Sequence, residues 1–285
     1  MRIIFYILFS SFLLSGCDKV KFPIQEGGPG GPGGNQEKRK ILLEDYTGHR
    51  CGTCPPAANA ANSIANQYPG QVIVLSVHAG FLADPLGGTY SKDFRTQTGS
   101  TWFSTFGFVA TPSGMINRIM YPSSQHNLSW GVWSSVADTM VSRAPEAYLT
   151  FTKSYNASTR QVSGSIKTKF YKNLSGLHRL VIVLMEDSIV GAQTDNTQNP
   201  PDVLNYVHRH VLRGAVNSTW GDTLFSTSVA QGDSITKTFN YTILNTYGNI
   251  PCNDAKCYLI AFIYNDDPLS PRYREIIQAE EIHVK

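Results

Sequence analysis

The sequence predicts an α/β domain followed by an all-β sandwich domain of the Ig-like kind, on three observations. Between residues 41 and 118, signals for buried strands alternate with signals for helices, which is typical of an α/β unit. After Pro145, segments of period 2 take over, and several short strands separated by turns favour a β-sandwich. Apolar residues make up 41% of the 285 residues, which is enough for real hydrophobic cores.

Residues 1–16 have the pattern of a secretory signal peptide. Arg2 places a positive charge before an apolar run, and this run is too short to span a bilayer as a helix. The run ends in Leu-Ser-Gly-Cys, which resembles a bacterial lipoprotein box, where cleavage precedes a lipidated cysteine. The resemblance implies that Cys17 carries lipid and anchors the protein in the cell envelope. The pattern leaves the membrane open, because Asp18 favours the inner membrane in some sorting systems and other lineages ignore it. An ordinary secretion signal is the alternative.

Residues 17–40 predict a flexible tether after the lipidated cysteine. Its centre, residues 27–34, contains only Gly and Pro, which cannot pack a core. About 23 flexible residues reach roughly 25–30 Å, so the tether would lift a folded domain clear of the lipid surface.

The α/β domain is expected over residues 41–145, and its elements follow from local patterns. The helix expected after Cys54 begins with two prolines, which fit only in a first turn, where missing N–H groups do no harm. The expected elements, in order, are strands at 41–46 and 72–77, with that helix at 55–68 between them, a partly helical segment at 90–105, a short strand at 114–118 and a helix at 129–143.

The β-sandwich domain is expected over residues 146–285. Segments 162–170 and 235–243 alternate apolar and polar residues, as half-buried strands do. Segments 180–185 and 258–264 are continuously apolar, which indicates central strands, and 276–284 forms a last strand.

The motif Cys51-Gly-Thr-Cys54 stands between a buried strand and a helix start. A helix N-terminus favours a thiolate over a thiol, and His49 and Arg50 add positive charge beside Cys51. We expect Cys51 to be the nucleophile and Cys54 the more buried resolving thiol.

A resolving thiol needs a proton acceptor, and two carboxylates lie near the end of the first strand. Asp45, six residues before Cys51, is expected beneath the helix, and Glu44, which faces the other way, is the alternative.

Strand, Cys-x-x-Cys, helix, strand and then Thr111-Pro112 before a further strand resemble the thioredoxin fold. The resemblance implies that Pro112 is a cis-proline beside the disulfide, that the backbone at Thr111 pairs with substrate, and that Asp45 is the acid. The chain departs from thioredoxin itself because no Trp precedes Cys51, Thr53 replaces a proline, and two prolines follow Cys54.

Three stretches resemble, more narrowly, the twenty-eight-kilodalton outer membrane protein family of Gram-negative lipoproteins. They are residues 44–51, 111–118 and 206–213, and the similarity runs from about residue 40 to the C-terminus. This resemblance implies an outer membrane lipoprotein and a thioredoxin-like domain with no firmly assigned reaction.

We expect the remaining cysteines and histidines to have structural rather than catalytic roles. Cys252 and Cys257 enclose four residues before a strand, and we expect a structural disulfide there rather than a second redox site. A zinc site that uses both later cysteine pairs is a minor alternative. His208 and His210 would share a face if their segment is a strand, but structural histidines are favoured over metal ligands. His78 is expected to be a solvated loop residue.

Composition and charge exclude several function classes. The formal net charge of +3, without a Lys/Arg block, excludes nucleic acid as the main partner, and no motif calls for a cofactor or metal. The sequence therefore predicts thiol–disulfide exchange on envelope proteins. The alternative is a non-enzymatic surface or periplasmic binding lipoprotein, in which Cys51–Cys54 is a structural disulfide.

Overall fold

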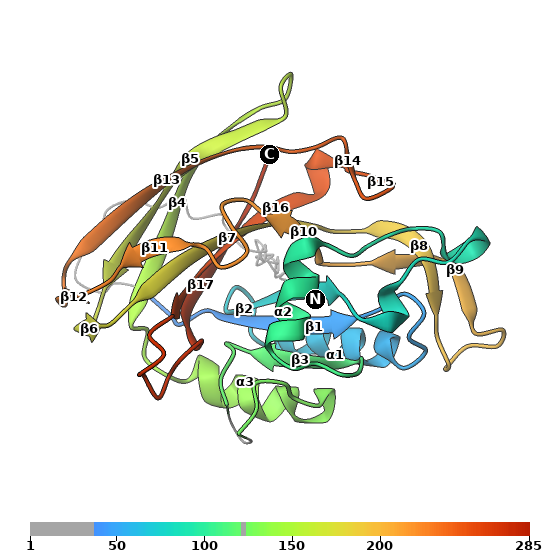
Figure 1. The fold of residues 1–285 in the computed structure, drawn as a ribbon, viewed down its shortest axis with the longest axis horizontal. Coiled ribbons are helices and arrows are strands. Elements are labelled where there is room, and N and C mark those ends of the chain that lie inside the picture. Colours follow the sequence, from blue (N-terminus) through green and yellow to red (C-terminus); the bar gives the residue numbers. More distant parts are fainter. Residues whose placement is uncertain (1–36, 121–123) are drawn as a thin grey trace, which may run out of the picture. The chain divides into compact units, whose positions relative to one another are not determined.

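Strands account for most of the regular structure in the computed structural model, which describes residues 37–120 and 124–285 (Figure 1). The expected signal peptide, Cys17 and most of the tether lie outside the described residues. Residues 37–285 cluster as one compact unit. Within the described ranges, no helix is both long and apolar enough to cross a membrane.

The first element group is a parallel pair of strands joined by a helix. β1 (Ile41–Thr47) and β2 (Val72–His78) pair in parallel over their whole length, and every residue of both is buried. α1 (Cys54–Gln67) connects them and packs its small apolar face, with Ala57, Ala61 and Ile64, into a shared core. β3 (Ser113–Ile116) runs antiparallel to β1 on its other edge. α2 (Gln97–Thr105) and α3 (Trp133–Val141) complete this part of the fold.

One large mixed sheet extends from these strands into the second half of the chain. Its order is β17-β16-β7-β10-β2-β1-β3, with β11 paired to β7. The added strands are β7 (His178–Glu186), β10 (Val211–Ala215), β11 (Asp222–Phe225), β16 (Cys257–Asn265) and β17 (Ile276–His283). The sheet is therefore continuous across the boundary expected at residues 145–146, and the link is the pairing of β10 with β2.

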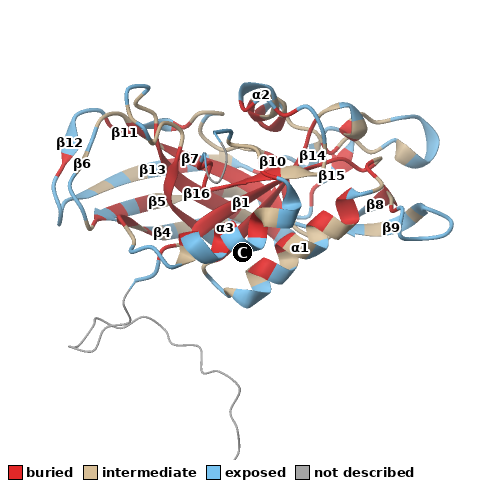
Figure 2. Ribbon diagram, turned by 90° about the horizontal axis from the view of Figure 1, so that it is seen from below, coloured by how far each residue is buried: buried red, intermediate tan, exposed pale blue. Residues whose placement is uncertain are grey.

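A smaller sheet packs against the far half of the large one. β4 (Ala147–Asn156), β5 (Gln161–Phe170) and β13 (Ser234–Thr242) form it in the order β13-β5-β4. Alternate residues such as Val162, Ile166 and Phe170 turn inward and share one core with β7, β16 and β17. This period of 2 explains the alternation in the sequence, because one face of each strand meets the core and the other meets solvent. Figure 2 shows the buried residues concentrated along the central strands.

The connections between the main strands contain a hairpin, several short strands and single helical turns. The β8–β9 hairpin, made of β8 (Ile189–Thr194) and β9 (Asp202–His208), is a two-stranded sheet of its own. The other short strands are β6 (Leu174–Ser175), β12 (Ser228–Val229), β14 (Thr246–Tyr247) and β15 (Ile250–Pro251). Single 3-10 turns lie at Phe81–Ala83, Gly88–Tyr90, Trp130–Val132 and Asp254–Lys256.

Candidate redox site

Cys51 and Cys54 form a disulfide at the N-terminus of α1, with their Cα atoms 5.4 Å apart. Cys51 lies in the turn that follows β1, and Cys54 is the first residue of the helix. Pro55 and Pro56 occupy the next two positions, where the N–H groups that they lack would have had no partner inside the helix. The local sequence thus fixes both the turn and the place where the helix begins.

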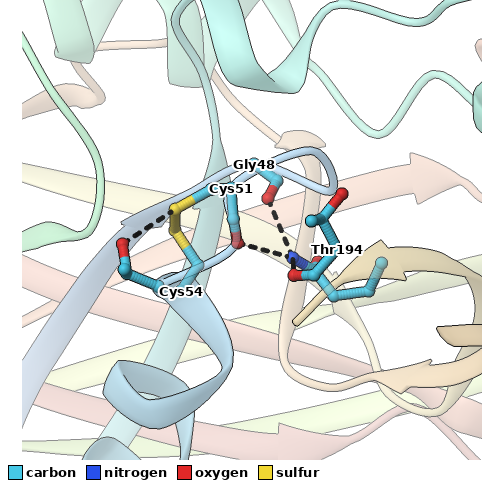
Figure 3. The surroundings of a disulfide bond; sticks show 6 residues. Gly48, Cys51, Cys54 and Thr194 are labelled. Carbon is cyan, nitrogen blue, oxygen red and sulfur yellow. Dashed lines mark hydrogen bonds between the residues drawn. A yellow bond between two sulfur atoms is a disulfide. The ribbon is translucent and has the colours of Figure 1, made fainter. Parts of the chain in front are cut away.

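The β8–β9 hairpin packs against the turn that carries this disulfide (Figure 3). The Gln193 side-chain amide donates to the carbonyl oxygens of Gly48, at 3.3 Å, and Cys51, at 3.0 Å. Two backbone N–H groups of the hairpin add to this: Thr194 N donates to His49 O and Asn196 N donates to Gly52 O, both at 2.9 Å.

The hairpin fits closely against the disulfide turn, and both cysteines are buried. A Cβ atom at Gly52 would lie 2.1 Å from the Asn196 side-chain oxygen, so a larger residue there would require the Asn196 side chain to turn away. Cys51 is only 1% exposed and Cys54 only 2%. The sequence predicts a difference in burial between the two cysteines, and the structure buries them equally.

Asp45 lies in β1 and lines the same cavity as Cys54. Its side chain is 1% exposed, and Oδ1 has no hydrogen-bond partner among the described residues. Burial disfavours the charged form and raises the pKa of Asp45 to about 7. A carboxyl group with this pKa exchanges protons readily at neutral pH, as a general acid–base group must.

Glu44 points to the opposite face of β1, because successive strand residues alternate. Its carboxylate accepts two hydrogen bonds from Arg118, each 2.8 Å long, and both side chains are completely buried. The Arg118 guanidinium also stacks over Trp102 and Phe262. Glu44 is therefore a core ion-pair partner, and Asp45 is the carboxylate that shares a cavity with the disulfide.

His49, which the sequence predicts to supply positive charge, is neutral. It is 1% exposed, and burial, with Arg50 next in effect, lowers the pKa of His49 to about 4. Arg50 remains beside Cys51 in the chain, but its guanidinium lies over the Phe81 ring, 4.8 Å from the centroid, and donates to the Phe81 carbonyl oxygen. The expectation for His49 is thus wrong, because the histidine is buried rather than solvated.

Two further histidines line the cavity. His78 and His208 are each 3% exposed, and their rings pack on Phe94 with centroids 4.8 and 4.3 Å from it. Burial lowers the pKa of His208 to about 3 and that of His78 well below its usual range. His78 is therefore not the solvated loop residue that the sequence predicts. His210 has a φ of +55° after the end of β9, so it does not share a strand face with His208.

Thr111 and Pro112 are joined by a cis peptide bond, as the resemblance implies. They immediately precede β3, whose first residue, Ser113, pairs with Tyr46 at the end of β1. Both side chains are half-buried. The fold thus brings this dipeptide to the strand end from which the disulfide turn begins.

Cys252 and Cys257 are free thiols with their sulfurs 3.5 Å apart. The expected disulfide is not formed here, since a disulfide bond requires about 2.05 Å. The hydrogen bond between the two sulfurs, followed by burial, raises the pKa of Cys257. Their sulfurs and a Glu186 carboxylate oxygen lie within 4.8 Å of one another, a set that could hold a metal ion. Arg213 Nε stands 3.2 Å from Glu186, and its positive charge opposes a cation there.

The comparisons with known proteins place the chain in a family. The model of outer membrane protein Omp28 matches residues 100–282, well over half of the sequence. The chain belongs to the Omp28 family. The matched range includes Thr111-Pro112, Arg118 and the β8–β9 hairpin but begins after Cys54. Membership therefore supports an outer membrane protein, and the case for redox chemistry rests on the geometry of the disulfide site.

Two solved structures resemble this Omp28 family member along most of its length. HBP35 of Porphyromonas gingivalis is 17% identical, with a TM-score of 0.63, and the match covers 87% of this chain and 76% of HBP35. Protein AGR_C_4864 from Agrobacterium tumefaciens is 15% identical, with a TM-score of 0.50 and coverage of 88% and 96%. At these identities the likeness shows the fold alone. No curated protein sequence matches the chain.

Proposed function

We propose that this Omp28 family member is a lipid-anchored envelope protein that exchanges thiols and disulfides through Cys51 and Cys54. The outer membrane location follows from the family, and the lipid on Cys17 rests on the sequence pattern before it. Its partners would be the thiols and disulfides of other envelope proteins. The observation that carries the proposal is the buried acid Asp45, which lines the same cavity as Cys54.

The chemistry assigns one role to each group. The Cys51 thiolate, favoured by the N-terminus of α1, attacks a substrate disulfide and releases one substrate sulfur as a thiolate. Cys54 gives its proton to Asp45 and attacks the Cys51 sulfur. This second step breaks the mixed disulfide, releases the other substrate sulfur as a thiolate and leaves Cys51–Cys54 oxidised. The substrate is reduced by two electrons, and the reverse sequence oxidises a substrate dithiol.

The order of elements supports a thioredoxin-like assignment for residues 41–145. β1, α1 and β2 form a parallel unit around the Cys-x-x-Cys turn, and β3 follows a cis Thr111–Pro112 bond on the other edge of β1. In such folds the residue before this proline binds the substrate backbone, a role that we propose for Thr111. The packing of the β4, β5 and β13 sheet on the large sheet supports an Ig-like sandwich for residues 146–285.

A protein substrate can reach Cys51 only when its surroundings move, because Cys51 is buried, and we assign this movement to the β8–β9 hairpin, which is bonded to the Cys51 carbonyl oxygen. The same burial favours a second candidate function. In that version Cys51–Cys54 is a structural disulfide that fastens the hairpin, and the protein acts as a binding lipoprotein. The two candidates differ in one measurable property, the reactivity of the disulfide in the folded protein.

The reduction potential of Cys51–Cys54 separates them. The protein is equilibrated in graded thiol/disulfide buffers, and alkylated cysteines are counted peptide by peptide. A potential between roughly −120 and −270 mV supports exchange, and a value below about −300 mV supports the structural disulfide. Cys51→Ser should abolish exchange without unfolding the protein, and Cys54→Ser should trap mixed disulfides with envelope proteins. Cys252→Ser, away from the site, is the matched control and should retain exchange.

A further inference from the structure

A cavity of about 220 Å³ lies beside Cys54, between α1, β2 and the β8–β9 hairpin, whose residues Gln193, Tyr206 and His208 form part of its wall. Its inner wall includes the buried residues Asp45, Cys54 and His78, and its rim includes the exposed residues Asn59 and Arg209. Cys51 does not line it. Of the two cysteines of the disulfide, Cys54 is therefore the one that borders the cavity.

We infer that this cavity admits a low-molecular-weight thiol, which reduces the disulfide by attacking Cys54 rather than Cys51. The inference rests on the proposed function, and it names the electron donor class for the same site. Protein substrates would then meet Cys51 when the hairpin moves, and small thiols would meet Cys54 through the cavity. Cys51 would exchange with protein substrates, and Cys54 would receive the attack of the small thiol that reduces the disulfide.

The size of the cavity limits the donor to a short thiol. At roughly 30 Å³ per water molecule, 220 Å³ holds about seven non-hydrogen atoms. Free cysteine has about this size, whereas a tripeptide thiol is too large to enter whole. The chain of a protein substrate is excluded for the same reason.

Unpaired polar atoms of the lining residues Asp45, His78 and His208 lie just beneath the cavity wall. Asp45 Oδ1, both ring nitrogens of His78 and Nε2 of His208 are buried and have no hydrogen-bond partner in the described part of the chain. Leaving such groups unpaired is costly, so a polar ligand gains affinity when these side chains turn toward it and bond it. Because both imidazoles are held neutral, the inner cavity suits a neutral or zwitterionic thiol rather than an anion.

The reaction balances with the thiol as the reductant. The entering thiol gives its proton to the Asp45 carboxylate, and its sulfur attacks the Cys54 sulfur. The Cys51–Cys54 bond breaks, and Cys51 takes the electron pair and then a proton to become a thiol. A second small thiol attacks the sulfur of the first, which leaves Cys54 as a thiol as well. Two small thiols are oxidised to one disulfide, and the protein gains two electrons.

The test locates the first adduct on the purified, oxidised full chain. Free cysteine is added, the reaction is quenched early with acid and maleimide, and the peptide that contains both cysteines is sequenced by mass spectrometry. We expect cysteine on Cys54 and maleimide on Cys51. Asn59→Trp, at the cavity rim, should slow this reaction at least tenfold and leave the reduction potential unchanged. Asn66→Trp, exposed on the same helix but away from the cavity, should react like the wild type.

An adduct on Cys51, or equal rates for the two tryptophan variants, would overturn the inference. Exchange with a peptide disulfide is measured on the same variants and tests the proposed function separately. Peptide exchange that persists while cysteine attacks Cys51 refutes only the small-thiol route. If the folded disulfide reacts with neither free cysteine nor the peptide, the route and the proposed function are both refuted.

Discussion

Two adjacent carboxylates on β1 show how the environment of a single residue decides its role. Glu44 meets a guanidinium and two aromatic rings, and Asp45 meets a cavity and no positive partner. The sequence could place them on opposite faces, since strand residues alternate. It could not show which face Arg118 occupies, because 74 residues separate Arg118 from Glu44.

The raised pKa of Asp45 predicts a specific pH dependence of stability. The folded state holds this proton up to about pH 7, whereas an unfolded chain releases it near pH 3.8. The folded state therefore binds more protons between these values, and its stability falls as the pH rises through them. The shift corresponds to a loss on the order of 4 kcal/mol.

Asp45→Asn should remove this loss. We expect the variant to gain stability over the wild type as the pH rises from 4 to 8, measured by urea unfolding, and to exchange disulfides more slowly. Asp138→Asn changes an exposed carboxylate on α3 and should leave the pH profile unaltered. A constant difference between Asp45→Asn and the wild type at every pH would contradict the raised pKa.

Glu44 and Arg118 should stabilise the folded protein mainly through their interaction with each other. Glu44→Gln leaves a guanidinium buried without its counter-charge, which typically costs about 3–5 kcal/mol. Arg118→Met leaves a buried carboxylate and should cost a similar amount, and the double variant should lose much less than the sum. Urea unfolding of the four proteins gives the coupling free energy. Arg209→Met breaks an exposed pair with Asp187 and should cost below about 1 kcal/mol. Additive losses for Glu44 and Arg118 would contradict this account.

Among the elements, the β8–β9 hairpin has the greatest influence on the site. Gln193 reaches Gly48 across 145 residues of sequence, and the hairpin carries no regular hydrophobic period that would reveal it as a cover. The sequence of the hairpin therefore did not indicate that Cys51 is buried. Gly52 was the one available signal, because a glycine inside a Cys-x-x-Cys motif permits another segment to approach closely.

Removing the Gln193 side chain should expose Cys51. Gln193→Ala deletes the hydrogen bonds to Gly48 and Cys51 and loosens the cover. We expect reduction of the disulfide by a thiol on a long polymer, which cannot enter the cavity, to accelerate several-fold, followed by alkylation of Cys51. Gln198→Ala removes the same side chain from the exposed tip of the hairpin and should have no effect. Equal rates for both variants would show that the hairpin does not control access.

Strands and helices with strong periodicity were predictable from the sequence. β7 and β16 were expected as central strands from their continuous apolar runs, and the sheet order confirms this, since each has neighbours on both sides. The alternation in β13 matches a strand with one buried face. The local pattern of apolar and polar residues does not show which distant strands pair. The pairing of β10 with β2 could therefore not be predicted from the sequence.

At the scale of the whole molecule, the continuous sheet predicts cooperative folding. β2 exposes its free edge when residues after 145 are removed, because Ser76 N donates to His210 O at 2.7 Å and Val211 pairs with Ser76. One hydrophobic core also mixes Leu42 and Leu75 with Val183 and Phe262 from the second half. Removing those partners exposes apolar surface that stabilises the fold by about 25 cal/mol per Å².

Residues 37–145 alone should therefore fail to fold cooperatively, and the complete chain should unfold in a single transition. Urea unfolding followed by far-UV circular dichroism and by tryptophan fluorescence tests this, with coincident curves expected for the complete chain. Adding a fragment of residues 146–285 to the first fragment should restore a folded complex. Two separate transitions, or a first fragment with a sharp transition of its own, would instead establish two independent domains divided at residues 145–146. That outcome would leave the Cys51–Cys54 site able to work without the second half of the chain.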